Sequence, residues 1–225
     1  MWSTCATCVV SSLLLAARAA LWLTSGHPRA AQMGLLEGAL LAHCTHVTPS
    51  QLSLMRTHDA RIAHCPLSNV YFSPERSLPL IEVARQQVKV GLGSDISGGY
   101  DPSILSNARW AVGVSKSRRA AAAAPPPSAE CATDDDASID WVDALRLATQ
   151  GGATALGLGE RCGSLLRVGM AFDAQLIDLT DADDGGFDTF DELVRREFRD
   201  TVQKWFHMGD KSHRKGVWVQ GRRLL

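Results

Sequence analysis

The run from Lys89 to Tyr100 places a single carboxylate, Asp95, directly after a short apolar stretch that is rich in glycine. Alternate residues of an extended strand face opposite sides, so Val90 and Leu92 share one face and Asp95 belongs to the glycine face. We expect the first face to pack against the protein and the second to leave room for a ligand. A carboxylate at the end of such a strand has the chemistry of a metal ligand.

Two earlier segments have the same form, a short apolar run that ends in a residue able to do chemistry. Residues 38–44 contain His43, and residues 60–66 contain His64. Two stretches of helical composition separate the three runs: residues 48–56 and 78–87. The resulting order of strand, helix, strand, helix, strand predicts a parallel sheet. Functional residues at the carboxyl ends of successive parallel strands are typical of (β/α) barrel enzymes.

Three motifs carry these residues: LAHCTH at 41–46, AHCPLSN at 63–69 and GLGSD at 91–95. Taken in order, they resemble the last three barrel strands of the amidohydrolase superfamily of metal-dependent hydrolases. Within that superfamily, residues 91–105 look most like the guanine deaminases, and the resemblance extends over residues 33–225. It implies an α/β fold: the carboxyl-terminal part of a (β/α)8 TIM-like barrel, about strands 6 to 8, followed by part of a small β-sandwich.

The resemblance implies a zinc-assisted hydrolysis that belongs to purine catabolism. In this reaction metal-bound water attacks the ring carbon that carries the amino group of guanine, giving xanthine and ammonia. By position, Asp95 would be the eighth-strand metal ligand and the proton acceptor, so it is both a metal and a catalytic candidate. His43 would be the sixth-strand residue, catalytic and in contact with the water and the substrate. His64 is expected to line the pocket, as a substrate contact or as a structural residue.

The other zinc ligands of the superfamily have no match in this sequence. They are a His-x-His pair and a further His on earlier strands, and the His-x-x-Glu motif that supplies a proton shuttle is also unmatched. A catalytic zinc normally has three protein ligands plus water. We therefore expect the carboxyl-terminal portion of such an enzyme, with zinc as cofactor and an incomplete ligand set. Two alternatives stay open: a related amidohydrolase acting on another aminated heterocycle, and a catalytically inactive remnant.

A different zinc site, built from the cluster of histidines and cysteines in the first two motifs, is disfavoured. Neighbouring residues of a regular strand point to opposite faces, so His43 and Cys44 cannot both face one metal. The paired-cysteine spacing of a zinc finger is also absent from these motifs. The cysteines of the chain show no regular framework, which indicates free thiols in a cytoplasmic protein.

The charge balance bears on the partners. The chain has 23 Lys and Arg against 24 Asp and Glu, a net charge of −1. No strong field of one sign therefore recruits nucleic acid or an anionic membrane, and a small-molecule purine substrate is the expected partner. A partial barrel leaves an unpaired sheet edge, which favours poor solubility, association such as a homodimer, or repair of the edge by the amino-terminal segment.

We expect three regions along the chain. Residues 1–32 form an apolar segment without resemblance to the superfamily, and the lack of Lys or Arg before Val9 favours a cytosolic helix over a signal peptide. Residues 33–165 form the partial barrel, with a disordered insertion at 117–138. Residues 166–225 form the β-sandwich portion with a helix. Further helices and strands are predicted at 104–114, 140–150, 187–208, 172–178 and 217–219.

Overall fold

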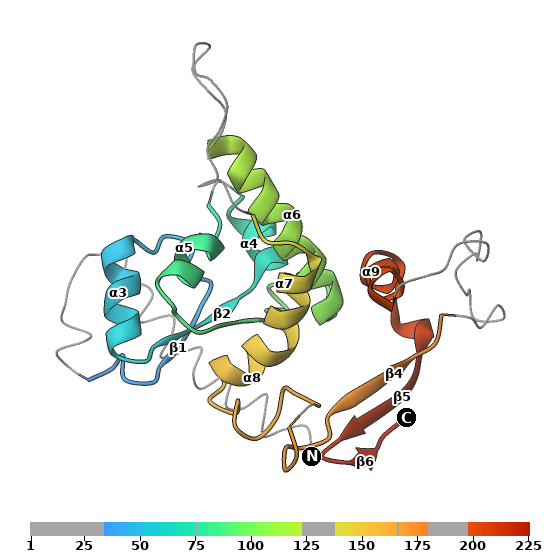
Figure 1. The fold of residues 1–225 in the computed structure, drawn as a ribbon. Coiled ribbons are helices and arrows are strands. Elements are labelled where there is room, and N and C mark those ends of the chain that lie inside the picture. Colours follow the sequence, from blue (N-terminus) through green and yellow to red (C-terminus); the bar gives the residue numbers. More distant parts are fainter. Residues whose placement is uncertain (1–33, 75, 123–137, 166, 180–197) are drawn as a thin grey trace. The chain divides into compact units, whose positions relative to one another are not determined.

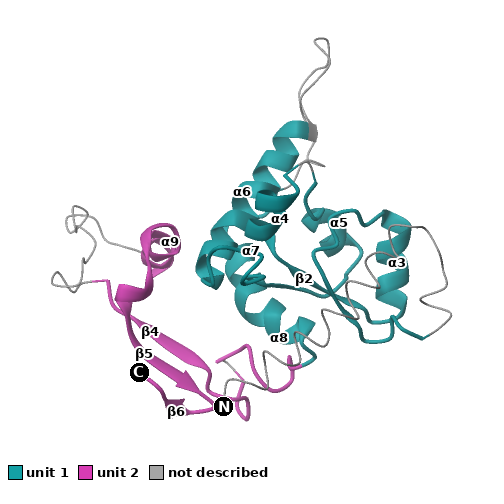
Figure 2. Cartoon of the chain, turned by 180° about the vertical axis from the view of Figure 1, so that it is seen from behind, with its two compact units in different colours: residues 1–157 teal, residues 158–225 magenta. Residues whose placement is uncertain are grey.

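A computed structural model describes residues 34–74, 76–122, 138–165, 167–179 and 198–225 of the chain. The chain divides into two compact units, residues 1–157 and residues 158–225 (Figure 2). The sequence predicts that the barrel portion ends and the β-sandwich portion begins at residue 166, whereas the structure divides the chain before Leu158.

The first unit contains a parallel sheet of three strands in the order β1-β2-β3 (Figure 1). The strands are β1 (Leu40–Ala42), β2 (Arg61–His64) and β3 (Val90–Leu92). Ala63 is the partner of Ala42 on one side and of Gly91 on the other, and both ladders are parallel. The parallel sheet predicted from the alternation of strands and helices is therefore confirmed.

Three short helices connect these strands (Figure 1). They are α3 (Pro49–Thr57), α4 (Pro66–Phe72) and α5 (Leu80–Arg85). The start of α3 is set by a capping box, in which Thr48 accepts from the backbone N–H of Gln51 and the Gln51 side chain accepts from that of Thr48. Leu52 and Met55 of this helix are buried, so their packing holds the helix on the unit.

Helix α6 (Ile104–Ala122) is longer than the sequence predicts. The sequence pattern predicts a helix that ends at Val114 and a disordered insertion that begins at residue 117, but the helix continues through residues 117–122. The chain enters an alanine run there, and alanine has the highest intrinsic helix propensity. Most of the expected insertion, residues 123–137, lies outside the described residues.

The predicted helix at 140–150 is a composite of three pieces. They are α7 (Trp141–Arg146), the π-helical turn η1 (Leu147–Gly151) and α8 (Gly152–Ala155). Asp140 caps the first piece by accepting from the backbone N–H groups of Val142 and Asp143, at 2.8 and 3.0 Å. The last two pieces lie against β3.

This packing corrects one expectation about the glycine face of β3. A Cβ atom on Gly91 would lie 2.6 Å from the Cα of Gly152, and one on Gly93 would lie 3.0 Å from the Sγ of Cys65. The space beside these glycines is therefore filled by helix backbone and by a thiol. The glycines permit a close approach of strand and helix, and they do not leave room for a ligand.

The second unit contains an antiparallel sheet in the order β4-β5-β6. Its strands are β4 (Ala174–Ile177), β5 (Arg214–Val219) and β6 (Arg222–Arg223). Gln220 and Gly221, with φ of 51° and 77°, form the two-residue turn between β5 and β6, as a tight hairpin requires.

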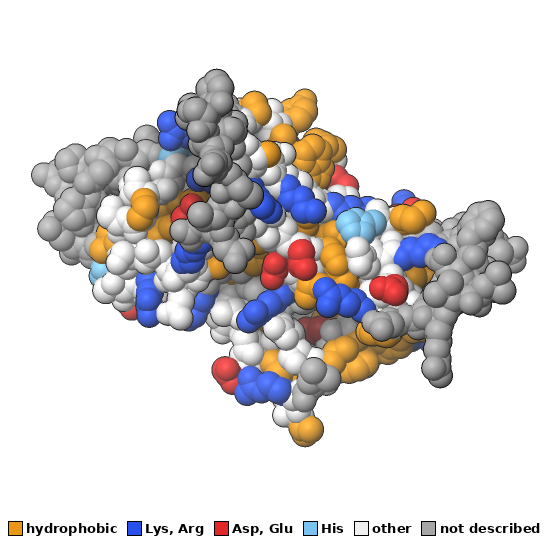
Figure 3. All heavy atoms as spheres, turned by 45° about the horizontal axis from the view of Figure 1, so that its top comes forward, with side chains coloured by type: hydrophobic (Ala, Val, Ile, Leu, Met, Phe, Trp, Pro, Cys, Tyr) orange, Lys and Arg blue, Asp and Glu red, His pale blue; other side chains and the backbone are white. Residues whose placement is uncertain are grey.

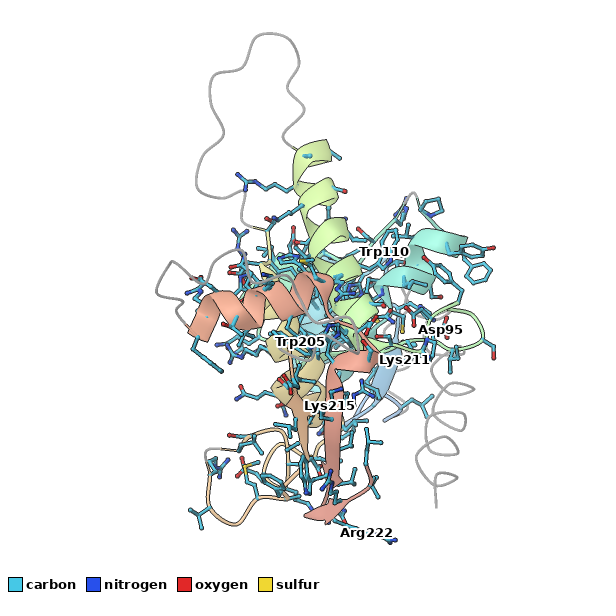
Figure 4. All side chains as sticks on the ribbon, turned by 90° about the vertical axis from the view of Figure 1, so that its right-hand side faces the viewer. Asp95, Trp110, Trp205, Lys211, Lys215 and Arg222 are labelled. Atoms are coloured by element: carbon cyan, nitrogen blue, oxygen red, sulfur yellow. The ribbon has the colours of Figure 1, made fainter. Side chains whose placement is uncertain are left out.

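The same unit contains α9 (Phe198–Met208) and the 3-10 turn η2 (Lys211–His213). Trp205, labelled in Figure 4, lies on α9. The helix confirms the carboxyl-terminal part of the one predicted at 187–208, while residues 187–197 lie outside the described part.

Two surface properties bear on the expected partners. Within the described ranges, no helix is both long enough and apolar enough to cross a bilayer. On the face shown in Figure 3, the basic side chains of the described residues are more frequent than the acidic ones, and the two kinds lie interspersed.

Candidate functional site

The three predicted residues follow, or end, the three parallel strands. His43 comes directly after β1, His64 is the last residue of β2, and Asp95 lies in the loop after β3, where Figure 4 labels it. The structure brings two of them together at the carboxyl edge of the sheet: His43 Nε2 lies 3.8 Å from Asp95 Oδ2. Both side chains are partly accessible, at 36% and 23% exposed, so a small molecule can reach them.

Two further residues, Ser68 and Asn69 in the first turn of α4, complete this cluster. The Ser68 hydroxyl donates to Asp95 Oδ2 at 2.5 Å, and Asn69 Oδ1 lies 2.7 Å from His43 Nδ1. Both residues are nearly buried, at 3% and 5% exposed. The sequence pattern predicts no role for them, although both belong to the motif that contains His64. The signal that could have found them is their place just after Pro66, which begins a helix at the carboxyl end of β2.

The backbone is unusual where these side chains are presented. His43, Cys44 and Asp95 have φ of 65°, 49° and 48°, in the left-handed region that residues other than glycine rarely adopt. Such conformations cost of order 1–3 kcal/mol each and are typical of functional sites. At Asp95 the turn is closed by the N–H of Gly99, which donates to the Asp95 carbonyl. His43 and Asp95 are residues that the sequence singles out for chemistry, although Asp59, Gln87 and Gln220, outside the cluster, also have positive φ.

His64 is completely buried, with 0% of its surface exposed. Neither ring nitrogen has a hydrogen-bond partner among the described residues. Burial, with a smaller contribution from the charge of His43, lowers the pKa of His64 to about 3, so its imidazole is neutral at physiological pH. A contact between His64 and a substrate stays a prediction, since the side chain has no exposed surface in this arrangement.

Cys44 and Cys65 lie close to the same edge, and both are free thiols. Burial raises the pKa of each to about 12, and the charges of Asp95 and Cys44 add to the effect at Cys65. These cysteines are therefore protonated near neutral pH, whereas a metal ligand must be a thiolate.

The residues present do not fit a catalytic zinc by themselves. Among the residues that the structure describes, no group of three or more His, Cys, Asp or Glu side chains could hold a metal ion. Asp95 is one oxygen ligand of the right chemistry, but a catalytic zinc takes three ligands from the protein. A zinc ion at this edge would therefore need ligands from outside the described residues.

The first unit also has an open cavity of about 510 Å³. It is lined by residues 45–49 together with Arg76, Pro79 and Arg118, and it includes neither His43 nor Asp95. The side chains suited to acid–base chemistry thus belong to the strand-end cluster of His43, Ser68, Asn69 and Asp95, and not to this cavity.

Comparisons with known proteins identify the family of the chain. The model of the Amidohydrolase family matches residues 22–224. A guanine deaminase of Dictyostelium discoideum is 33% identical over 190 residues, which cover 84% of this chain and 38% of that protein. The chain thus spans about two fifths of the length of this relative.

Solved structures extend the comparison to the fold. E. coli guanine deaminase matches with a TM-score of 0.66 at 23% identity, over 84% of this chain and 39% of that one. An adenosine deaminase from Xanthomonas campestris, solved with bound zinc, matches with a TM-score of 0.66 at 24% identity, over 88% and 39%. At this identity the likeness supports a TIM-barrel type of α/β fold. Because the family model matches almost the whole sequence, the chain belongs to the amidohydrolase family.

Proposed function

We propose that the protein is a guanine deaminase, which hydrolyses guanine to xanthine and ammonia in purine catabolism. The observation that carries the proposal is the convergence of His43 and Asp95 at the carboxyl edge of the parallel sheet, with 3.8 Å between Nε2 and Oδ2. The identity to a guanine deaminase over most of this chain supports the choice of substrate. Because the chain spans about two fifths of that relative, the proposal concerns the part of the catalytic machinery that this chain supplies.

In this proposal Asp95 is the general base and His43 orients the water. The water oxygen forms a bond to the ring carbon that carries the amino group, and Asp95 accepts one of its protons. That proton passes to the amino nitrogen, the carbon–nitrogen bond breaks, and ammonia leaves. Ser68 and Asn69 hold the two catalytic side chains through their hydrogen bonds to Asp95 and His43.

The finer assignments of the fold and the metal belong to the same proposal. β1, β2 and β3 would be the sixth, seventh and eighth strands of a (β/α)8 barrel, and β4 to β6 part of a β-sandwich. Zinc would be the cofactor, with Asp95 as one ligand and the others contributed from outside the described residues. The bound zinc of the Xanthomonas structure supports this choice of metal.

The test combines metal content with product formation. The full chain is purified and dialysed, its zinc is measured by elemental analysis, and conversion of guanine to xanthine is followed by ultraviolet absorbance. We expect Asp95→Asn to lose both bound zinc and xanthine formation. Asp59→Asn is the matched control, since Asp59 also has a positive φ, 50°, but bonds to Arg61 and Lys89, away from the cluster. Wild-type protein that binds zinc yet forms no xanthine would contradict the proposal.

A second candidate is a related amidohydrolase that acts on another aminated purine. The fold of the Xanthomonas adenosine deaminase favours it as the alternative. A panel of guanine and adenosine at equal concentrations separates the two, because ammonia released from adenosine alone would support the alternative.

A further inference from the structure

We infer that Ser68 and Asn69 are positioning residues, which present His43 Nε2 and Asp95 Oδ2 as two adjacent hydrogen-bond acceptors for one shared donor. Four side chains carry the inference, from the ends of β1 and β3 and from the first turn of α4. The inference deepens the proposed function, because it states what the two hydrogen bonds determine: the tautomer of His43 and the direction of the acceptor on Asp95.

The first step concerns the tautomer of His43. The amide oxygen of Asn69 can only accept a hydrogen bond, so its 2.7 Å contact with His43 Nδ1 requires a hydrogen on that nitrogen. A neutral imidazole carries a single N–H, so Nε2 then has a free lone pair. Asn69 therefore makes Nε2 an acceptor.

The second step concerns the carboxylate of Asp95. The Ser68 hydroxyl lies 2.5 Å from Oδ2, the short distance of a charge-assisted O–H···O⁻ bond. The hydroxyl donates to this oxygen and occupies one of its acceptor positions, which fixes the direction of the other. Since Ser68 is only 3% exposed, water does not compete for this bond.

The third step follows from the separation of the two acceptors. His43 Nε2 and Asp95 Oδ2 are 3.8 Å apart, which is too far for a direct hydrogen bond. An oxygen placed about 2.8 Å from each atom would see them at roughly a right angle, close to the angle between the two O–H bonds of water. One water molecule can therefore donate to both atoms. The identification of this donor as the attacking water rests on the proposed function, whereas the tautomer does not.

The arrangement depends on neighbouring residues of a single helix turn. Pro66 begins α4 directly after Cys65, so Ser68 and Asn69 emerge side by side at the end of β2. One of them then bonds to the loop after β3, and the other to the residue after β1. The helix that follows the middle strand β2 thus orients one side chain at the end of each neighbouring strand, β1 and β3.

The experiment reads the tautomer of His43 directly. Full-length protein with ¹⁵N-labelled histidine is studied by long-range ¹H–¹⁵N NMR at about pH 8.5, above the usual histidine pKa. The signals of His43 are assigned by their loss in His43→Gln. We expect wild-type His43 to carry its hydrogen on Nδ1. An Nε2–H ring in wild-type protein would overturn the inference, because Asn69 would then present its NH₂ group and His43 would be a donor toward Asp95.

Two variants of Asn69 test the cause. Asn69→Asp keeps an oxygen acceptor and is expected to retain the Nδ1–H ring. Asn69→Leu removes the acceptor and is expected to shift the population toward Nε2–H. His58, whose Nδ1 lies 3.2 Å from Glu37 Oε2, serves as an internal control that should not change. An unchanged His43 tautomer in a folded Asn69→Leu protein would also overturn the role of Asn69.

The role of Ser68 is tested on Asp95 in the same way. With ¹³C-labelled aspartate, the ¹³C chemical shift of the Asp95 carboxyl group should change in Ser68→Ala. It should return to its wild-type value in Ser68→Thr, which restores the hydroxyl. No movement in Ser68→Ala would remove Ser68 from the inference. None of these measurements requires activity, so a failed guanine assay and a failed tautomer prediction are distinguishable.

Discussion

Gly91 of β3 and Gly152 of α8 meet backbone to backbone, so that a Cβ atom on Gly91 would lie 2.6 Å from the Gly152 Cα. The obstacle is helix backbone, which cannot turn aside as a flexible side chain can. We predict that Gly91→Ala lowers the free energy of unfolding by about 1–3 kcal/mol, the usual cost of overpacking. Urea unfolding followed by circular dichroism measures the change.

Gly113→Ala is the matched control for this prediction. Gly113 lies on an exposed part of α6, and a Cβ atom there would meet nothing within 4 Å. Replacing glycine by alanine inside a helix is expected to raise the free energy of unfolding by about 0.5–1 kcal/mol. If both substitutions change stability alike, the close approach at Gly91 does not determine the result.

The strands and the catalytic candidates were predictable from the sequence because both depend on local pattern. Short apolar runs separated by helical stretches indicate a parallel sheet, and the ends of parallel strands lie at one edge. His43 and Asp95 therefore had to lie near each other, and they do. The length of the apolar runs did not predict the length of the strands, since β1 and β3 have only three residues each.

The parts that the sequence did not predict depend on packing between distant segments. Ser68 reaches Asp95 across 27 positions of sequence, and Asn69 reaches His43 across 26. No local pattern states which way the first turn of α4 faces. The glycine face of β3 was misjudged for the same reason, because Gly152, which covers Gly91, lies 61 positions later in the sequence.

The buried His64 predicts a specific dependence of stability on pH. Burial lowers its pKa to about 3 in the folded protein, while an unfolded histidine titrates near 6.5. Between these values the unfolded chain binds the proton and the folded protein does not, so stability falls as pH is lowered through this window. The slope from this group is at most about 1.4 kcal/mol per pH unit.

Urea unfolding at several values between about pH 6.5 and pH 4 tests this slope in wild-type protein and in His64→Gln. Glutamine removes the titratable group, so the dependence on pH should be shallower in the variant. His58→Gln is the control, because the His58 side chain is 26% exposed and pairs with Glu37. Equal slopes in wild-type protein and His64→Gln would show that the fold does not lower the pKa of His64.

The thiols near the site should resist alkylation. Burial raises the pKa of Cys44 and of Cys65 to about 12, so little thiolate forms at pH 8. We predict that iodoacetamide modifies Cys162, which is only partly buried, before the buried Cys65 in native protein, and before Cys44, which is also partly buried but whose thiol has a raised pKa. Mass spectrometry of the peptides measures the order, and in urea all three should react at similar rates. Early labelling of Cys65 in the native state would show that its surroundings open readily.

Asp59 links the start of β2 to the residue before β3, since it accepts from Arg61 Nη2 at 2.6 Å and from Lys89 Nζ at 2.5 Å. The hydrogen bond from Arg61, followed by that from Lys89, lowers the pKa of the Asp59 carboxyl. The stability that it provides is therefore present above the unfolded pKa of about 3.9 and is lost as pH falls through the lower folded value. Because the side chain is 42% exposed, solvent screens the pair.

We predict that Asp59→Asn, which keeps a residue tolerant of positive φ, lowers the free energy of unfolding by about 0.2–1 kcal/mol at low salt. The difference should shrink in 1 M NaCl, where the screening length is about 3 Å. A difference that does not depend on salt would mean that the hydrogen bonds, and not the charges, join these two strands.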